Sequence, residues 1–130
     1  MIEREIRDIV EDAADDGARL NEIADQFRRG RDVNELVALL DSGDAELVSI
    51  GAWILGELRF ELYDIAPIMS RLWNLIDHED PAVRFGALGA LYPALDWQDV
   101  GTRALLRRLR NDANEGVRMR AEAATTRLSK

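Results

Sequence analysis

The sequence contains no cysteine and only one histidine among its 130 residues. Without cysteine the chain cannot form a disulfide, build a thiolate metal site or use a thiol nucleophile, which is compatible with a reducing compartment. The segment after Met1 has no basic stretch leading into an apolar run, and no stretch is long and apolar enough to span a bilayer. We therefore expect a cytoplasmic protein with no membrane partner.

Length and charge narrow the expectation further. A chain of 130 residues suits one domain, since it can bury about 65–70% of its unfolded surface. The net charge of -8 is uneven, because residues 1–64 contain 17 acidic and 7 basic residues whereas residues 65–130 contain 8 and 10. An acidic half repels phosphate backbones and speeds encounter with a basic partner, although acidity also serves solubility alone.

A pattern of apolar and small residues recurs about every 35 residues, a period typical of helical repeats. Its three copies begin at Asp44, Asp80 and Asn114, and each copy follows an apolar helical segment. Those segments contain Leu36, Leu39 and Leu40, then Leu72, Leu75 and Ile76, then Leu106 and Leu109. The unit is therefore a helical hairpin that occurs three times.

The second helix of each hairpin has its own start signal. Asp44, Asp80 and Asn114 can accept the free amide hydrogens of a first turn, and Pro81 suits the first helical position. Two further signals concern other boundaries: Asp64 is predicted to cap the helix that carries Pro67, and Pro93 is predicted to end or kink the second hairpin's last helix near Tyr92.

Residues 1–32 are expected to form a helical N-terminal cap ahead of the repeats, which span residues 33–130. Apolar residues at helical spacing predict two helices there, separated at Asp15-Asp16-Gly17. The first has Ile2, Ile6, Ile9, Val10 and Ala13 on its apolar face, and the second has Leu20, Ile23, Ala24 and Phe27. The helix near 18–29 could act as the second half of an incomplete repeat.

The segment Asp-Pro-x-Val-Arg-x-x-Ala-x-x-Ala-Leu, from Asp80 to Leu91, resembles the second helix of a HEAT repeat, and residues 54–58 resemble its usual ending. The resemblance implies an all-α fold, a short α-solenoid of HEAT-like helical hairpins whose second helices line a concave, partner-binding face. The third copy departs from the pattern at Thr125, and it carries Arg120 and Glu122 beside its small positions, as a solvent-facing terminal cap would.

Helical spacing turns several large side chains away from the apolar face of the second helices. A protein-binding site is predicted from these aromatics and the acids beside them: Trp53, Glu57, Phe60, Glu61, Phe85, Tyr92 and Asp96, with Met119 continuing the stripe. Exposed aromatic anchors ringed by charge are typical of protein interfaces. The alternative is that Trp53 and Phe85 pack on an adjacent hairpin, because stacked helices are buried over a wide arc.

Catalytic and metal sites have weaker candidates. His78 lies in Asp77-His78-Glu79-Asp80, whose side chains could hold a metal, but a solvated turn with Asp80 as helix cap explains the cluster. Glu57 and Glu61 lie one turn apart like an acid/base pair, yet have no positioned partner. We therefore expect no metal, no cofactor, no small-molecule substrate and no enzyme activity.

A basic run supplies the nucleic-acid alternative. Arg103, Arg107 and Arg110 share one helix face and could grip phosphates, and some HEAT-like proteins bind DNA or act on damaged bases. The acidic N-terminal half and the lack of interleaved aromatics oppose this interpretation. A solvated terminal repeat, whose arginines neutralise nearby acids and favour the helix C-terminus, is therefore the preferred explanation.

The sequence thus favours a non-catalytic protein-interaction module. Its size, acidity and helical class resemble bacterial immunity proteins, which neutralise a toxin with a basic surface by covering it. A nucleic-acid-binding or DNA glycosylase-like protein and a lyase-like or scaffold HEAT protein are the alternatives.

Overall fold

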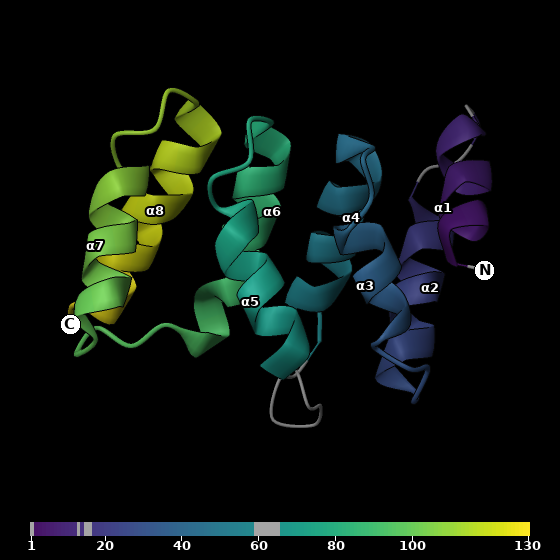
Figure 1. Cartoon of the computed structure of the whole chain (residues 1–130), viewed down its shortest axis with the longest axis horizontal. Helices are drawn as coiled ribbons and strands as arrows, with labels where there is room; N and C mark the ends of the chain where they lie inside the picture. The colour runs from purple at the N-terminus through teal and green to yellow at the C-terminus, as the bar shows by residue number, and fades with distance from the viewer. Residues whose placement is uncertain (1, 13, 15–16, 59–65) are drawn as a thin grey trace.

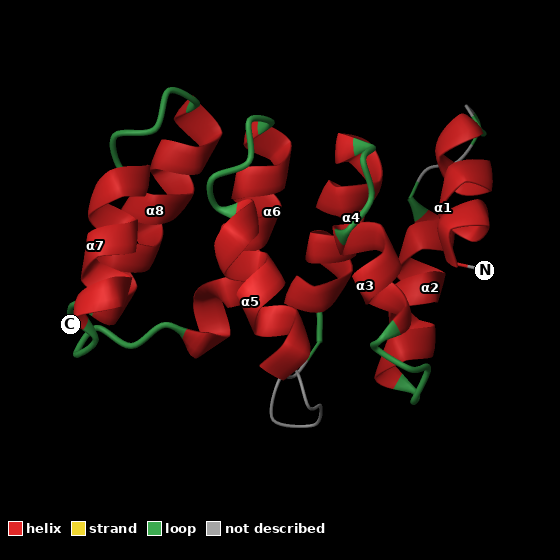
Figure 2. Cartoon of the chain, viewed as in Figure 1, coloured by secondary structure: helices red, strands yellow, loops and turns green. Residues whose placement is uncertain are grey.

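The computed structural model describes residues 2–12, 14, 17–58 and 66–130, and these contain helices and turns but no strand (Figures 1 and 2). The α-helices are, in chain order, α1 (Ile2–Glu11), α2 (Ala18–Arg28), α3 (Glu35–Leu40), α4 (Ala45–Gly56), α5 (Ala66–Leu75), α6 (Pro81–Leu91), α7 (Val100–Leu109) and α8 (Glu115–Leu128), with a 3₁₀ helix, η2 (Tyr92–Ala94), after α6. The predicted all-α class is confirmed for this part of the chain. None of its helices is long and apolar enough to cross a bilayer.

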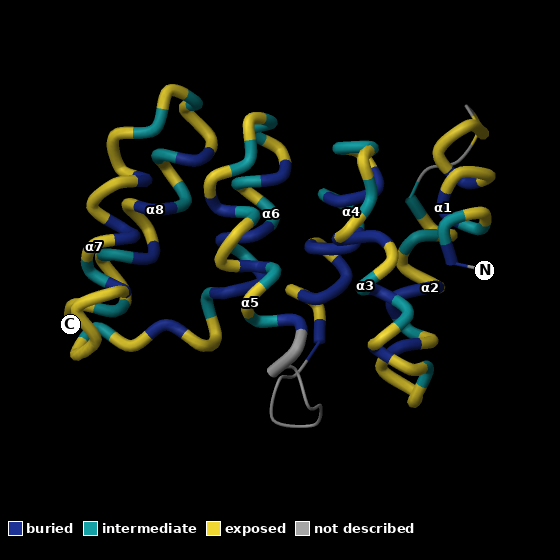
Figure 3. The backbone as a smooth tube through the Cα atoms, viewed as in Figure 1, coloured by how far each residue is buried: buried dark blue, intermediate teal, exposed yellow. Residues whose placement is uncertain are grey.

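The helices lie in a row of pairs along the long axis of the molecule (Figure 1). Helix α3 packs on α4, α5 on α6 and α7 on α8, while α4 contacts α6 and α6 contacts α8 across successive pairs. Every helix contributes buried residues (Figure 3), and most of them join one continuous apolar cluster that runs from Ile2 to Ala124. The core therefore extends along the whole row.

The predicted starts of the second helices are confirmed. An Oδ1 atom accepts an amide hydrogen in each case: Asp44 from Glu46 at 3.0 Å, Asp80 from Ala82 at 2.8 Å and Asn114 from Val117 at 3.1 Å. Each bond satisfies one of the free amides of a first helical turn, which explains why these helices begin where they do.

Other predicted boundaries are met in part. Helix α6 ends at Leu91 and gives way to η2, which contains Pro93, as expected from the missing amide hydrogen of proline. Asp64, the predicted cap of the next hairpin, lies outside the described residues, and α5 begins at Ala66. Asp99, which the sequence analysis did not single out as a cap, accepts the amide hydrogen of Gly101 at 3.0 Å and starts α7.

The N-terminal helices follow the predicted apolar pattern with one exception. Ile2, Ile6 and Ile9 are buried in α1, and Ile23, Ala24 and Phe27 are buried in α2. The prediction that Val10 lies on the buried face is wrong, because its side chain is 36% exposed. At about 100° per residue, Val10 lies roughly 80° around the helix from Ile2. Ala13, Asp15 and Asp16 lie outside the described residues. Gly17, at φ +93°, precedes α2 in a conformation that glycine adopts without strain.

Small residues let α4 and α6 approach closely. A Cβ atom at Gly86 would lie 3.2 Å from the Cβ of Ala52, so almost no space separates the two helices there. Ala87 and Ala90 of α6 are completely buried. Within the first hairpin, a Cβ at Gly51 would lie 2.9 Å from the Cβ of Leu39. The packing therefore requires small side chains at these positions.

Two arginines make the same contacts in successive second helices. Arg84 Nη1 donates to the carbonyls of His78 and Glu79 at 2.8 and 3.0 Å, and Arg118 Nη1 donates to those of Asp112 and Ala113 at 2.8 and 3.1 Å. Each arginine thus ties its helix to the loop that precedes it. The first copy has the buried Val48 at this place.

Arg84 also joins two hairpins. Its Nε and Nη2 atoms each lie 2.9 Å from a carboxylate oxygen of Asp112, and the two side chains are only 15% and 10% exposed. The hydrogen bonds from Arg84 lower the pKa of Asp112 below its ordinary value, against the opposing effect of burial. A bidentate pair with little solvent contact holds the loop before α8 onto α6.

We predict that Ala87→Leu and Ala90→Leu each lower the free energy of unfolding by about 1–3 kcal/mol, because the added side chain has no space. Urea unfolding followed by circular dichroism measures the change. Ala104→Leu, on the exposed side of α7, is the matched control and should change little. Unchanged stability in both α6 variants would show that these positions tolerate larger residues.

We also predict that Asp112→Asn lowers the free energy of unfolding by about 1–3 kcal/mol at pH 7. Because the folded pKa of Asp112 is lowered, its stabilisation is fully present above the unfolded pKa of about 3.9 and is lost as the pH falls through the folded pKa. The difference between variant and wild type should therefore shrink in acid. Unfolding measured from pH 7 to pH 2 checks this.

Asp77→Asn supplies the control for that measurement. Asp77 pairs with Arg108 at 3.0 Å, but its side chain is 68% exposed, so the pair adds little to stability. Equal losses in the Asp77 and Asp112 variants, or a loss at Asp112 that does not depend on pH, would contradict the assignment.

Candidate binding groove

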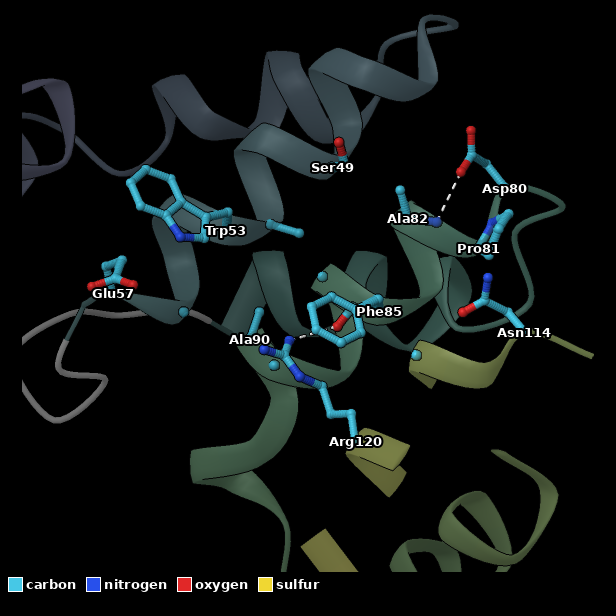
Figure 4. A pocket seen from close by; sticks show the side chains of 15 residues that line it. Ser49, Trp53, Glu57, Asp80, Pro81, Ala82, Phe85, Ala90, Asn114 and Arg120 are labelled. Atoms are coloured by element: carbon cyan, nitrogen blue, oxygen red, sulfur yellow. Dashed lines mark hydrogen bonds between the residues drawn. The ribbon is translucent and has the colours of Figure 1, made fainter. Parts of the chain in front are cut away.

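A groove with a volume of about 610 Å³ crosses α4, α6 and α8 on the side away from the core (Figure 4). We call it the central groove; its main side chains are Trp53 from α4, Glu57 directly after α4, Phe85 from α6 and Arg120 from α8. Four glycines also line it: Gly56, Gly86, Gly89 and Gly116. Since glycine has no side chain, these positions leave the surface hollow between the larger residues.

Trp53 and Phe85 are the large apolar side chains of the central groove. They are 37% and 38% exposed, whereas Ile54, Leu55 and Ala87, which lie one or two residues from them in the sequence, are completely buried. Helical spacing had placed both aromatics away from the apolar face. The structure brings them to the same hollow from two different hairpins (Figure 4).

Arg120 is the residue of the groove that the sequence analysis did not identify. Its Nη1 atom donates to the Phe85 carbonyl at 2.9 Å, and its guanidinium carbon lies 3.6 Å from the centroid of the Phe85 ring. The expectation that Arg120 faces solvent as part of a terminal cap is therefore wrong: the side chain crosses from α8 to α6 and is partly buried. This burial lowers the pKa of Arg120 from its ordinary value.

A glycine on the facing helix makes this position possible. A Cβ atom at Gly89 would collide with the Arg120 guanidinium, so any larger residue there would displace the arginine. In the aligned repeats, Arg120 stands where Ile50 and Gly86 stand in the first two copies. That departure from the repeat was visible in the sequence, but its meaning depends on what the neighbouring helix presents.

Glu57 lines the central groove and already has a partner. Its Oε2 atom accepts from Arg28 Nη2 at 3.1 Å, which links α2 to the end of α4. Both side chains are more than a third exposed, so the pair adds little to stability. Phe60 and Glu61, the other predicted site residues near it, lie outside the described residues.

Tyr92 and Asp96 do not line the central groove. Tyr92 packs partly against the core and lines an adjoining hollow of about 330 Å³, the Tyr92 pocket, which shares Gly89 and Arg120 with the groove. Asp96 lies in the loop after η2, where its Oδ1 accepts the amide hydrogen of Gln98 at 3.0 Å. Both were placed by continuing helical angles past Leu91, where Pro93 ends the α-helix.

A third hollow continues the same face toward the N-terminus. It has a volume of about 290 Å³ and is lined by Leu20 and Asn21 of α2 and by Ser49, Ile50 and Trp53 of α4. Trp53 therefore separates this hollow from the central groove, as Arg120 separates the groove from the Tyr92 pocket. The result is a grooved face that extends over α2, α4, α6 and α8.

The other candidate sites have structural contacts. His78 Nδ1 accepts the amide hydrogen of Asp80 at 2.9 Å, and no group of three potential metal-ligating side chains occurs in the part of the chain that was searched. Of the predicted basic face, Arg103 folds back to donate to the carbonyl of Trp97, while Arg107 and Arg110 are exposed. The arginine face is thus only partly available to a phosphate backbone.

A scan against protein-family models found no match, and searches of curated proteins and of solved structures found no significant match. Function is therefore inferred from the geometry of the grooved face.

Proposed function

We propose that this protein is a non-catalytic protein-binding module, a short solenoid of three HEAT-like hairpins with an N-terminal helical cap, and that its partner docks in the central groove. The observation that carries the proposal is the exposure of Trp53 and Phe85 in one hollow, from two neighbouring second helices.

The repeat architecture has support from equivalent contacts. Asp80 and Asn114 cap the second helices of successive pairs, and Arg84 and Arg118, four residues later, each bond to the two carbonyls five and six residues before them. Unrelated helices have no reason to share both features. Together with the contacts from α4 to α6 and from α6 to α8, they favour stacked copies of one unit.

The central groove has the chemistry of a protein interface. Tryptophan and other aromatics bury much area with few rotatable bonds, and they dominate the binding free energy of many complexes. The groove is open and continues into hollows on both sides, so it suits an extended segment of a partner better than an enclosed small molecule. Binding of a protein segment requires no set of catalytic side chains.

The charge of the chain favours a partner with a basic surface. The net charge is -8, and the acidic residues are concentrated in residues 1–64. Such a field accelerates the approach of a basic protein and repels other acidic ones. An immunity protein that covers the basic surface of a toxin is one protein that works in this way.

We predict that Trp53→Ala and Phe85→Ala each weaken partner binding by about 2 kcal/mol or more, as truncation of interface anchors does. The partner is first isolated by crosslinking to the tagged protein in its native host, and binding is then measured by surface kinetics. Trp73→Ala is the matched control, because Trp73 is also 37% exposed but lies on α5 outside the described hollows.

Each variant is checked for native melting before binding is measured. Equal affinity of the Trp53, Phe85 and wild-type proteins would place the interface elsewhere, with the acidic N-terminal helices as the next surface to examine. Collapse of the fold in the Trp53 or Phe85 variant would show that the side chain belongs to the core.

We predict that duplex DNA and RNA bind no more tightly than about 10⁻⁶ M at about 150 mM salt. The acidic half of the chain opposes phosphate, and Arg103 and Arg108 are held by Trp97 and Asp77. Titration of labelled duplexes measures the affinity. Tighter binding that is lost in Arg107→Gln would instead support nucleic-acid recognition.

A further inference from the structure

We propose that Arg120 binds a carboxylate of the partner, an Asp or Glu side chain in an extended segment that lies along the central groove. This inference rests on the proposed function, since it names the chemistry that the same groove recognises.

The guanidinium of Arg120 is held in one orientation with most of its donors unused. It stacks on the Phe85 ring at 3.6 Å and donates one hydrogen bond, from Nη1 to the Phe85 carbonyl. A guanidinium has five N–H groups. Among the described residues, the Phe85 carbonyl is the one acceptor that the Arg120 guanidinium contacts. A carboxylate can take two parallel N–H groups of an arginine, which matches the donors that are left.

Two other arginines with little exposed surface have carboxylate partners. Arg31 pairs with Glu5 and Glu35, and Arg84 pairs with Asp112; their side chains are 16% and 15% exposed. Arg120 is also drawn out of water by its position over Phe85, as its lowered pKa indicates, yet it has no ion-pair partner among the described residues. Partial desolvation of an uncompensated charge is unfavourable, and a ligand carboxylate would offset it.

The groove favours one anionic group over a polyanion. Glu57 and Asp80 also line it, and the whole chain carries a net charge of -8. A single carboxylate at Arg120 meets attraction at short range, whereas a string of phosphates would meet the two acids and the overall field. The partner segment is therefore expected to carry one acidic residue within a surface that is otherwise neutral or basic.

The surroundings of Arg120 specify the neighbours of that acid. Phe85 and Trp53 lie on one side in the central groove, and Tyr92 lies on the other side in the adjoining pocket. Apolar residues on both sides of the acid would bury against these rings. The expected recognition element is an Asp or Glu between apolar side chains.

A random peptide library displayed on phage tests this without knowledge of the natural partner. The full chain and its Arg120→Gln variant are used in parallel selections. The wild type should enrich peptides with one Asp or Glu beside apolar residues, and Arg120→Gln should enrich peptides without that preference. Arg110→Gln makes the same change of charge at an exposed position directly after α7 and should select as the wild type does.

The tightest selected peptide then allows a double-mutant cycle. Changing its acid to the amide, or Arg120 to Gln, should each weaken binding by about tenfold or more, since hydrogen bonds between charged groups are lost. The two changes together should weaken binding little more than either one alone, as expected when the two groups contact each other. Thermal melting confirms that each variant is folded.

Gly89→Ala is a second variant that keeps the charge but removes its position. The new methyl group collides with the guanidinium, so Arg120 must shift from its position over the Phe85 ring. Alanine is otherwise favourable inside a helix, which preserves the fold. The preference for the peptide acid over its amide should therefore fall toward that of Arg120→Gln.

The outcomes separate this inference from the proposed function. Peptides that bind without an acid, yet lose binding in Trp53→Ala, would overturn the carboxylate and leave the groove as the binding site. Peptides that are indifferent to Trp53→Ala and Phe85→Ala, or the absence of any enrichment, would overturn both. Equal acid preference in wild type and Arg120→Gln would also overturn the assignment of Arg120.

Discussion

The close contact between α4 and α6 is the constraint on which the rest of the structure depends. A Cβ atom at Gly86 would lie only 3.2 Å from the Cβ of Ala52, so no larger side chain fits between the two helices. Ala87 and Ala90 of α6 are fully buried. Two helices this close need small residues where they face each other. Small residues on the solvent side of the contact leave a hollow between the helices. The same choice of residues that permits the stacking therefore leaves Gly56 and Gly89 as the floor of a groove.

Much of the fold could be predicted because its signals are local. Asp44, Asp80 and Asn114 act within their own first turns, and Pro93 acts on the turn before it, so each boundary depends on a few adjacent residues. The prediction for Val10 was wrong because its exposure depends on its distance from the centre of the apolar face and not on its being apolar. Apolar residues at the edge of a helical face are where a pattern alone predicts least.

The candidate site was predicted only as far as regular helix geometry extends. Angles along α4 and α6 identified Trp53 and Phe85 as exposed, but the same angles fail for Asp96, because the α-helix ends at Leu91. The sequence pattern identified Glu57 but not its ion pair with Arg28, which lies in α2, 29 residues earlier in the chain. Arg120 and Phe85 are 35 residues apart, and their contact depends on the absence of a side chain at Gly89. Such contacts need the relative placement of helices, which periodicity does not contain.

The arginines of the second helices differ in what they contact, and this difference underlies the proposed role of Arg120. Arg84 and Arg118 each lie four residues after the residue that caps their helix, and each donates to backbone carbonyls of the loop before that helix. Their hydrogen bonds therefore stabilise the fold. Arg120 lies two residues further along α8, where Gly86 of the preceding copy serves close packing. Gly86 faces Ala52 of α4, and Arg120 likewise faces the preceding second helix, α6. At α6, Gly89 provides the space for the long side chain of Arg120, and the Phe85 ring orients its charge. Helix α8 thus adds a cation to a groove whose large apolar side chains, Trp53 and Phe85, come from α4 and α6.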